Sequence, residues 1–280
     1  MSNSTFDPTK LFSAEGLVVV ITGGGTGIGL MMATALENNR ATVYIVGRRK
    51  EKFGKIIPLQ GDVTSKESLS SLVSTIEQQS GHINLLINNS GIHGPAITHP
   101  KGPNKTIQDL QKALWEAPTD DFLSTFGVNV SGVYYTTVAF LNLLDKGNKK
   151  GGIHGVTSQV VTVSSIAAYR RDEGINGIAY SASKAAVTHL GKIFSSFLKE
   201  YDIRSNVIAP GIYPSEMSAQ VFGDATIAEL PRSIVPLGRM GTAEDMGSLI
   251  LFLATHGGAY ISGSIMTTDG ARLTQFPSTY

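Results

Sequence analysis

The sequence contains no cysteine among its 280 residues. This absence excludes disulfide bonds, a thiolate nucleophile and any metal site with cysteine ligands. Charged residues make up only 16% and the formal net charge is +1, which gives no electrostatic case for a nucleic-acid or membrane partner. No apolar run approaches the roughly 18 residues of a membrane span, and residues 1–10 lack the apolar stretch of a signal peptide. We therefore expect a cytoplasmic protein.

Short β-branched runs that alternate with helical patterns are, in contrast, abundant. This alternation predicts βαβ units and a parallel sheet with helices on both faces. Right-handed crossovers give a Rossmann-like, doubly wound α/β fold, for which we expect about seven strands in the order 3-2-1-4-5-6-7 and a single NAD(P)-binding domain over residues 1–280. The predicted strands are Leu17–Thr22, Thr42–Val46, Lys55–Gln60, Ile83–Asn88, Gln159–Ser164, Ile203–Ala209 and Ser264–Thr268. The predicted helices are Ile28–Asn39, Lys66–Ser80, Thr119–Lys146, Tyr180–Tyr201 and Ala243–Ala254.

Four connections stand out. Only about nine residues, starting at Gly47, separate the second and third strands, which is short for a parallel crossover. We expect at most one or two helical turns there and a poorly covered part of one sheet face. Residues 93–118 and 146–158 are predicted loops, the first with a short helix at Thr106–Glu116. Residues 213–236 are interpreted as a candidate mobile lid.

The first predicted strand runs into a glycine-rich turn, TGGGTGIG, at Thr22–Gly29. Glycines let the backbone turn sharply and approach a pyrophosphate without Cβ clashes, and the helix that follows offers free N–H groups. The alternative is a tight turn in a glycine-rich chain, but such a motif is expected by chance only about 0.03 times. We therefore predict that a dinucleotide binds at Gly23, Thr26, Gly27, Ile28 and Gly29.

The end of the second predicted strand indicates which dinucleotide is bound. An acidic residue there would bind the ribose 2′-hydroxyl of NAD, whereas an arginine would bind the 2′-phosphate of NADP. This chain has Gly47 followed by Arg48 and Arg49. The pattern favours NADP(H), with a solvated basic turn as the alternative.

A possible catalytic pair lies in the segment YSASK, where Tyr180 and Lys184 share one face of a helix. The pair alone carries little weight, since about 0.5 such pairs are expected by chance. Support comes from its surroundings. Ser165 follows a strand fifteen positions before Tyr180, and the segment NNSG at Asn88–Gly91 and Asn129 come earlier still.

With these motifs in this order, the chain resembles the short-chain dehydrogenase/reductase (SDR) family over about residues 14 to 272. The matching elements are TGGGTGIG, GDV at Gly61–Val63, NNSG, Asn129, Ser165, YSASK, Pro210-Gly211 and Asp269-Gly270. The segments ALWEAPTDDF, APGIYPSEM and TTDGARL are similar to those of fungal members.

The resemblance implies a catalytic set of Asn129, Ser165, Tyr180 and Lys184. A free tyrosine has a pKa of about 10, and a neighbouring ammonium lowers that pKa. Lys184 is expected to do so and to hold the nicotinamide ribose. Tyr180 would then exchange a proton with a carbonyl oxygen that Ser165 orients, while Asn129 holds a water of a proton relay.

The same resemblance implies further cofactor contacts. Asp62 and Val63 are expected to border the adenine, and Asn89, Ser90 and Gly91 to pass beneath the adenosine ribose. Residues expected beside the nicotinamide are Pro210, Gly211, Ile212 and Ser215, the last standing where members usually carry threonine. The short connection after Arg49 is the main departure from the family pattern.

The mouth of the substrate pocket is expected to include Ile166, His93, Tyr213, Met217 and Phe222. Because these side chains are mostly apolar, they favour a bulky, weakly polar ketone or alcohol. His93 is either a substrate-facing donor or a surface histidine without a role. The other histidines show no metal-ligand spacing, so no metal is expected.

The leading functional hypothesis is an NADP(H)-dependent oxidoreductase that interconverts a ketone or aldehyde and an alcohol. One alternative is a non-catalytic NADP-binding regulator or scaffold. Another is an imine or enone reductase on the same scaffold. By resemblance, a homodimer or homotetramer is expected, formed through the two long predicted helices.

Overall fold

Seven strands form one parallel sheet in this computed structural model, which describes residues 6–49, 54–97, 100, 102, 104–172, 177–222 and 229–279. The strand order is β3-β2-β1-β4-β5-β6-β7, which confirms the predicted doubly wound fold. Every neighbouring pair of strands is parallel. The strands are β1 Val18–Thr22, β2 Thr42–Gly47, β3 Ile57–Gln60, β4 Leu85–Asn88, β5 Gln159–Val163, β6 Arg204–Pro210 and β7 Ile265–Thr268.

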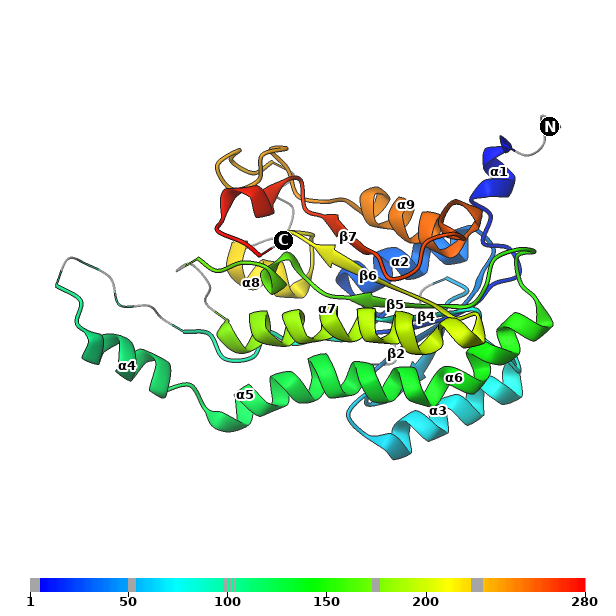
Figure 1. Cartoon of the computed structure of the whole chain (residues 1–280), viewed down its shortest axis with the longest axis horizontal. Coiled ribbons are helices and arrows are strands. Elements are labelled where there is room, and N and C mark those ends of the chain that lie inside the picture. The colour runs from blue at the N-terminus through cyan, green and yellow to red at the C-terminus, as the bar shows by residue number, and fades with distance from the viewer. Residues whose placement is uncertain are drawn as a thin grey trace.

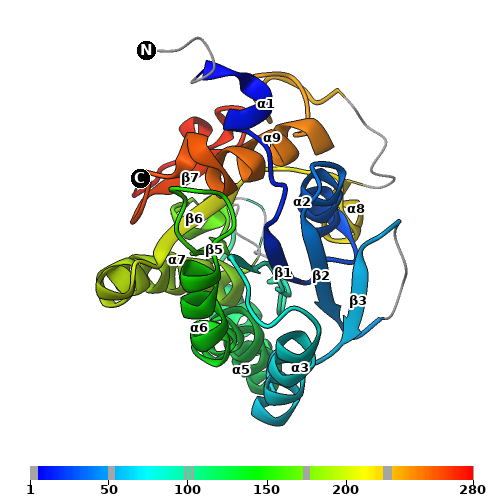
Figure 2. The ribbon, with the colours of Figure 1, turned by 90° about the vertical axis from the view of Figure 1, so that its right-hand side faces the viewer.

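Helices cover both faces of the sheet (Figures 1 and 2). On one face α2 (Gly27–Asn38) packs against α9 (Ala243–Ala254), and on the other lie α3 (Lys66–Gln79), α6 (Val133–Lys150) and α7 (Ile178–Leu198). Alternate residues of β1 divide between the two cores: Val19 and Ile21 join the first, Val18 and Val20 the second. Because helices bury both faces of the sheet, the residues on both sides of the central strands are apolar. The remaining helices are α1 Pro8–Leu11, α4 Ile107–Trp115, α5 Thr119–Phe126 and α8 Glu216–Phe222.

The predicted helix Thr119–Lys146 is instead three consecutive pieces. After α5 the chain forms a π-helical segment, Gly127–Gly132, and α6 then continues to Lys150. Gly132 allows a close approach here, because a Cβ at this position would lie 3.0 Å from Cγ2 of Val63. The π turn carries the buried Asn129, which matters for the site below.

The sheet edge at β3 is less buried than its centre. All five residues of β1 are buried, whereas Ile57, Pro58 and Leu59 of β3 are partly exposed and Gln60 is exposed. This agrees with the poor cover predicted from the short connection. Residues 48–49 and 54–56 contain no helix, and the rest of that connection, residues 50–53, lies outside the described residues.

Two searches of the described part of the chain gave negative findings. None of its helices is long and apolar enough to cross a membrane. It also contains no group of three or more histidine, aspartate or glutamate side chains that is able to hold a metal ion.

Candidate active site

The glycine-rich turn between β1 and α2 is shaped to take a ligand along its backbone. Gly23 and Gly27 have positive φ angles of 64° and 50°, which favour glycine. A Cβ at Gly29 would overlap the carbonyl oxygen of Gly23, and a Cβ at Gly24 would lie 2.5 Å from Cγ2 of Ile45. At Gly25, however, a Cβ would have no neighbour within 4 Å. The turn is therefore packed tightly on its inner side and open at Gly25.

The amino end of α2 also offers hydrogen-bond donors. Thr26 is the N-cap residue, yet its side chain makes no capping hydrogen bond. The first backbone hydrogen bond into this turn runs from Leu30 N to Thr26 O, at 3.2 Å. The amides that precede Leu30 in the helix have no carbonyl partner within it, so they can bind an anion with the help of the helix dipole.

Asn89 and Ser90, directly after β4, hold the glycine turn in place. Nδ2 of Asn89 donates to the carbonyl oxygens of Thr22 (3.2 Å) and Gly23 (2.9 Å). Oγ1 of Thr22 accepts from the backbone N–H groups of Asn89 and Ser90 at 3.0 and 3.1 Å. The structure thus brings these predicted site residues together with the turn, and adds Thr22, whose role the sequence did not reveal.

Tyr180, Lys184 and Ser165 come together at the carboxyl end of β5. Tyr180 and Lys184 lie on α7, and the Ser165 hydroxyl hydrogen-bonds the Tyr180 phenol. Ser165 also caps the short 3₁₀ helix Ile166–Ala168, where its Oγ accepts from Ala167 N at 3.1 Å. Nζ of Lys184 lies 5.7 Å from the centroid of the Tyr180 ring and donates to Val163 O at 2.9 Å.

The electrostatics of this group differ from the prediction. Burial raises the pKa of the Tyr180 phenol, and only the hydrogen bond from Ser165 opposes that rise. The expected net lowering of this pKa is therefore wrong for this structure, because burial outweighs the stabilisation of the phenolate by the nearby ammonium of Lys184. Burial also lowers the pKa of Lys184 to about 8. At neutral pH the phenol is thus protonated and the lysine still mostly charged, an arrangement that suits a proton donor.

Asn129 ties the loop after β4 to the helix that carries Tyr180. Its Oδ1 accepts from Ile92 N at 2.8 Å, while its Nδ2 donates to Ile92 O and to Oγ of Ser183, each at 2.9 Å. A Cβ on Gly91 would lie 3.3 Å from Asn129 Oδ1 and 3.4 Å from Lys184 Nζ. The side chain of Asn129 therefore positions the loop beside Lys184; its role in holding a relay water stays a prediction.

His93 lies on the face of Tyr180. The two rings stack with centroids 4.7 Å apart and an interplanar angle of 5°. Among the residues that the structure describes, none hydrogen-bonds the imidazole of His93. Burial, and then the charge of Lys184, lowers the pKa of His93, so the ring is neutral near pH 7. A neutral imidazole with an exposed edge can both donate and accept a hydrogen bond.

The segment after β6 lies against the glycine turn. Gly211 N donates to Thr268 O at 2.9 Å, and a Cβ on Gly211 would lie 2.7 Å from Cα of Asp269, so this backbone is fixed. Oγ of Ser215 accepts from Ser218 N at 3.0 Å, at the start of α8. A Cβ on Gly27 would lie 2.9 Å from the Cβ of Ser215. Of the predicted nicotinamide-side residues, Ser215 thus meets the turn, whereas Gly211 packs against the end of β7.

The predicted adenine-side residues gather at the carboxyl ends of β2 and β3. Arg48 is exposed, and its carbonyl oxygen accepts from Nε2 of Gln60 at 3.3 Å. Asp62 accepts from the backbone and side chain of Thr64 at 2.8 and 2.7 Å; these bonds, and then the charge of Arg48, lower its pKa. Val63 is buried beside Gly132. Arg49 instead forms a two-pronged ion pair with Glu216 on α8.

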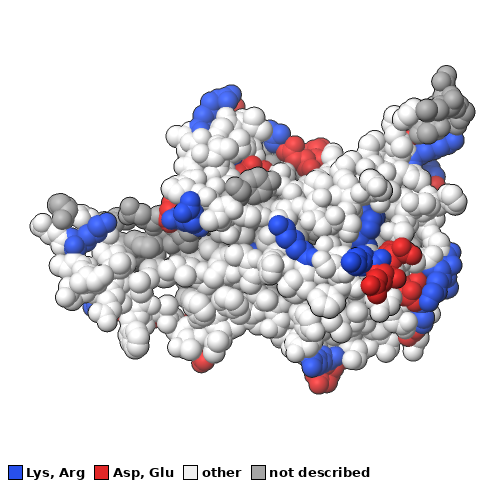
Figure 3. Space-filling view, in the orientation of Figure 1, with Lys and Arg blue, Asp and Glu red and all other residues white. Residues whose placement is uncertain are grey.

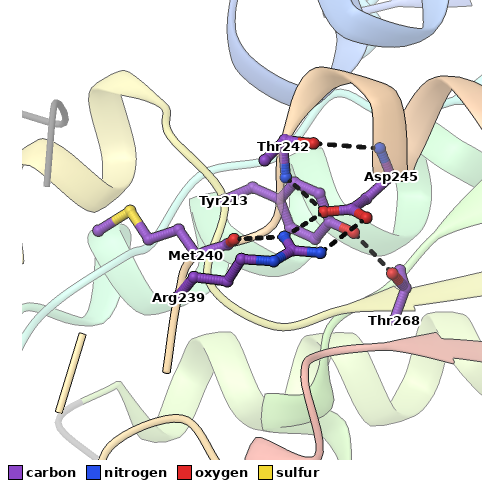
Figure 4. A network of polar contacts seen from close by, with 6 residues as sticks. All are labelled: Tyr213, Arg239, Met240, Thr242, Asp245 and Thr268. Carbon is purple, nitrogen blue, oxygen red and sulfur yellow. Dashed lines mark hydrogen bonds and ion pairs between the residues drawn. The ribbon is translucent and has the colours of Figure 1, made fainter. Parts of the chain in front are cut away.

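The expectation that Tyr213 lies at the mouth of the pocket is wrong. Its ring is only 3% exposed, packs beneath Gly241, and its hydroxyl lies 2.6 Å from Oγ1 of Thr268. Figure 4 shows this contact beside the ion pair of Arg239 with Asp245, at the start of α9. Arg239 also donates to Met240 O at 2.9 Å, and Thr242 N to Asp245 at 2.8 Å.

Much of the candidate lid is also packed rather than loose. Leu230 and Val235 form a small buried cluster with Met240. Earlier in the same segment, residues 216–222 form the helix α8. Residues 223–228 and the side chain of Phe222 lie outside the described part of the structure. Of the other predicted mouth residues, Ile166 is buried and Met217 half-buried.

Comparisons with known proteins add the following. Residues 23–271 match a family model described as enoyl-(acyl carrier protein) reductase. The chain is 47% identical over 283 residues to the short-chain dehydrogenase/reductase PhomF of Diaporthe leptostromiformis, covering 96% of each chain. It is 40% identical over 309 residues to the short-chain dehydrogenase/reductase VdtF of Byssochlamys spectabilis, covering 100% of each.

Solved structures agree with this similarity. The RhlG/NADP active-site complex of Pseudomonas aeruginosa has a TM-score of 0.78 and 26% identity, covering 94% of this chain and 98% of that one. The 3-ketoacyl-(acyl-carrier-protein) reductase from Brucella melitensis, complexed with NADH, has a TM-score of 0.74 and 25% identity, covering 93% and 100%.

Proposed function

The chain belongs to the short-chain dehydrogenase/reductase family, and on that premise we propose that it is an NADP(H)-dependent enzyme interconverting a ketone or aldehyde and an alcohol. One observation carries the proposal. A half-buried tyrosine whose phenol is influenced by the Ser165 hydroxyl, with the Lys184 ammonium over its ring, stands at the same end of the sheet as an open glycine turn. That end is where doubly wound folds bind their ligands.

The residues of the turn fit a dinucleotide. The space beside Gly25 and the unpaired amides at the start of α2 suit a pyrophosphate, and Ser215 borders Gly27. The residue that directly follows β2 and Gly47 is Arg48 rather than an acidic residue, which supports NADP over NAD. RhlG and the Brucella reductase were solved with NADP and NADH respectively, which supports a nicotinamide cofactor. When bound, the nicotinamide supplies or accepts the hydride.

In this mechanism Tyr180 gives its proton to the carbonyl oxygen of the substrate. Its raised pKa keeps the phenol protonated at neutral pH, as proton donation to a carbonyl oxygen requires. Ser165 donates a hydrogen bond to the same oxygen and so orients it. The charge of Lys184 stabilises the phenolate that forms, and Asn129 holds the Ile92 loop beside that lysine.

The substrate has an oxygen or nitrogen besides its carbonyl group. Its partner is His93, whose neutral imidazole is stacked on Tyr180 and has no hydrogen-bond partner among the described residues. The predicted pocket residues Ile166 and Met217 are apolar, which favours a bulky substrate.

We also propose a homodimer or homotetramer formed through α5, α6 and α7. Figure 3 shows that the face over these helices carries few charged side chains. Light scattering after gel filtration measures the mass directly. Large apolar side chains exposed on α5, α6 and α7 include Phe122, Leu123, Tyr134, Tyr135, Val138, Ile193 and Phe197.

We further propose that residues 1–280 form a single domain and that the protein is located in the cytoplasm.

One labelling experiment tests the activity against its alternatives. The protein is incubated with NADPH deuterated at the transferable position and a panel of ketones, aldehydes, enones and imines. Deuterium on the carbinol carbon of an alcohol product is the expected result. Deuterium on the β-carbon of a saturated ketone, or on the carbon of an amine, would replace the proposal by enone or imine reduction. NADPH binding with no transfer to any compound would favour the regulator or scaffold.

A further inference from the structure

Arg49, after the end of β2, is held by a carboxylate from a distant part of the chain. Its Nη1 lies 2.9 Å from Oε1 of Glu216 and its Nη2 lies 3.1 Å from Oε2, so the pair is two-pronged. Hydrogen bonds from Arg49 lower the pKa of Glu216, which is therefore charged at neutral pH. The two residues are 167 positions apart, and their side chains are 58% and 63% exposed.

Glu216 is the first residue of α8, and α8 begins at the cofactor turn. The residue before it, Ser215, is the one whose Cβ would contact a Cβ on Gly27. The ion pair thus joins the end of β2 to a helix that starts beside the glycine turn. An anion that approaches Arg49 must share the guanidinium with Glu216 or displace it.

We infer that Glu216 is a determinant of cofactor preference that competes with the 2′-phosphate of NADP for Arg49. This inference rests on the proposed function. The phosphate and the carboxylate are both anions, so on one guanidinium they repel each other. NAD carries a neutral hydroxyl at the same position and leaves the pair intact. Glu216 therefore weakens the binding of NADPH and leaves that of NADH unchanged.

The magnitude follows from the exposure of the pair. Exposed ion pairs contribute little because water screens them, so removing the competing carboxylate is expected to tighten NADPH binding about two- to fivefold. Added salt should shrink the difference, since it screens the repulsion as well.

Calorimetric titration of the whole protein with NADPH and with NADH tests the inference without any substrate. In Glu216→Gln the dissociation constant of NADPH falls about two- to fivefold and that of NADH stays unchanged. Glu15→Gln is a matched control, because Glu15 pairs with Arg40 at 3.1 Å with exposures of 63% and 76%, in a pair that involves none of the proposed site residues. It should change neither constant. Placed on an Arg49→Gln background, Glu216→Gln should no longer tighten NADPH binding.

Three results would overturn the inference: NADPH binding that weakens or stays the same in Glu216→Gln, an equal shift for both nucleotides, or an undiminished effect on the Arg49→Gln background. Failure of the proposed function looks different, because the unaltered protein would then bind neither nucleotide or would bind NADPH without transferring hydride to any compound of the panel. Unfolding curves of each variant confirm that the titrated protein is folded.

Discussion

At the amino ends of the central strands, buried polar side chains bond to one another and to the backbone. Gln159 of β5 donates to Leu253 O at 2.9 Å and accepts from Asn206 at 2.7 Å. Arg204 of β6 reaches the carbonyl oxygens of Gly258 at 2.9 Å and Thr157 at 3.1 Å. These groups make several hydrogen bonds within the protein and thereby join β5, β6 and α9, although Nε of Arg204 has no partner among the described residues.

At the carboxyl ends, several polar groups have few hydrogen-bond partners among the described residues. The glycine turn is open beside Gly25, and no hydrogen bond from a described residue reaches the imidazole of His93. Within the described residues, the ammonium of Lys184 donates a single hydrogen bond, to Val163 O, and its pKa is lowered to about 8. The comparison teaches that buried groups with several hydrogen bonds join the elements of the fold, whereas groups with few protein partners at the carboxyl ends are able to bind a ligand.

The largest expected effect separates chemistry from stability. Tyr180→Phe keeps the ring and its stacking on His93 but removes the proton donor. We expect kcat to fall about 10³-fold, within the range for a lost general acid, while the free energy of unfolding changes by less than about 1 kcal/mol. Turnover assays and urea unfolding measure the two quantities. Full activity in the Tyr180→Phe variant would contradict the proposed mechanism.

Arg204→Met is expected to lower the stability of the fold and to leave the catalytic rate unchanged, the opposite of Tyr180→Phe. It leaves the carbonyl oxygens around Gly258 and Thr157 without their donor, so the free energy of unfolding should drop by about 3 kcal/mol. Turnover per folded molecule should stay unchanged. Arg40→Met, which breaks only an exposed pair with Glu15, is the control, with an expected loss below about 1 kcal/mol. Equal losses in both variants would remove the distinction drawn for the amino ends.

The pH dependence of reduction should follow Lys184. Its pKa is lowered to about 8, so above that pH the ammonium that stabilises the Tyr180 phenolate is lost. We expect kcat for reduction to be level below pH 8 and to fall about tenfold per unit well above it. In the Lys184→Arg variant, the decrease of kcat with rising pH should begin at a higher pH, because the guanidinium group stays charged. This shift is expected at any absolute rate of the variant. A flat profile across pH 8 would speak against this role.

The smallest expected effect concerns His93. His93→Phe keeps a ring to stack on Tyr180 but loses the hydrogen bond to a second polar group of the substrate. For such a substrate KM should rise about three- to tenfold at nearly constant kcat, whereas a simple ketone should show no change. His93→Gln should restore part of the loss. Equal changes for both substrates would reduce His93 to a packing residue.

The sequence predicted those features that depend on local patterns. Strand order followed from alternating apolar runs, and the turn at Thr22–Gly29 from glycine spacing. Tyr180 and Lys184 were predicted from their spacing to share one helix face, and their grouping with Ser165 followed from the resemblance to the SDR family. All of these are short-range signals.

Features that depend on distant contacts were missed or misread. The pairing of Arg49 with Glu216 joins residues 167 positions apart, and no local sequence pattern predicts it. Tyr213 was assigned to the pocket from its place after a strand, but the packing of Gly241 and the Thr268 hydroxyl turn it inward. The pKa of Tyr180 likewise depends on burial, which the spacing of Tyr180 and Lys184 does not reveal.

Hydrogen exchange with and without saturating NADPH tests most directly whether the two ends of the sheet differ in this way. The account predicts slower exchange of the backbone amides at Gly23–Gly29, and of those from Asn89 to Ile92, once NADPH is bound. Amides around Gln159, Arg204 and Gly258 should exchange at the same rate in both states. Protection confined to the amino ends, or none at the glycine turn, would contradict the account.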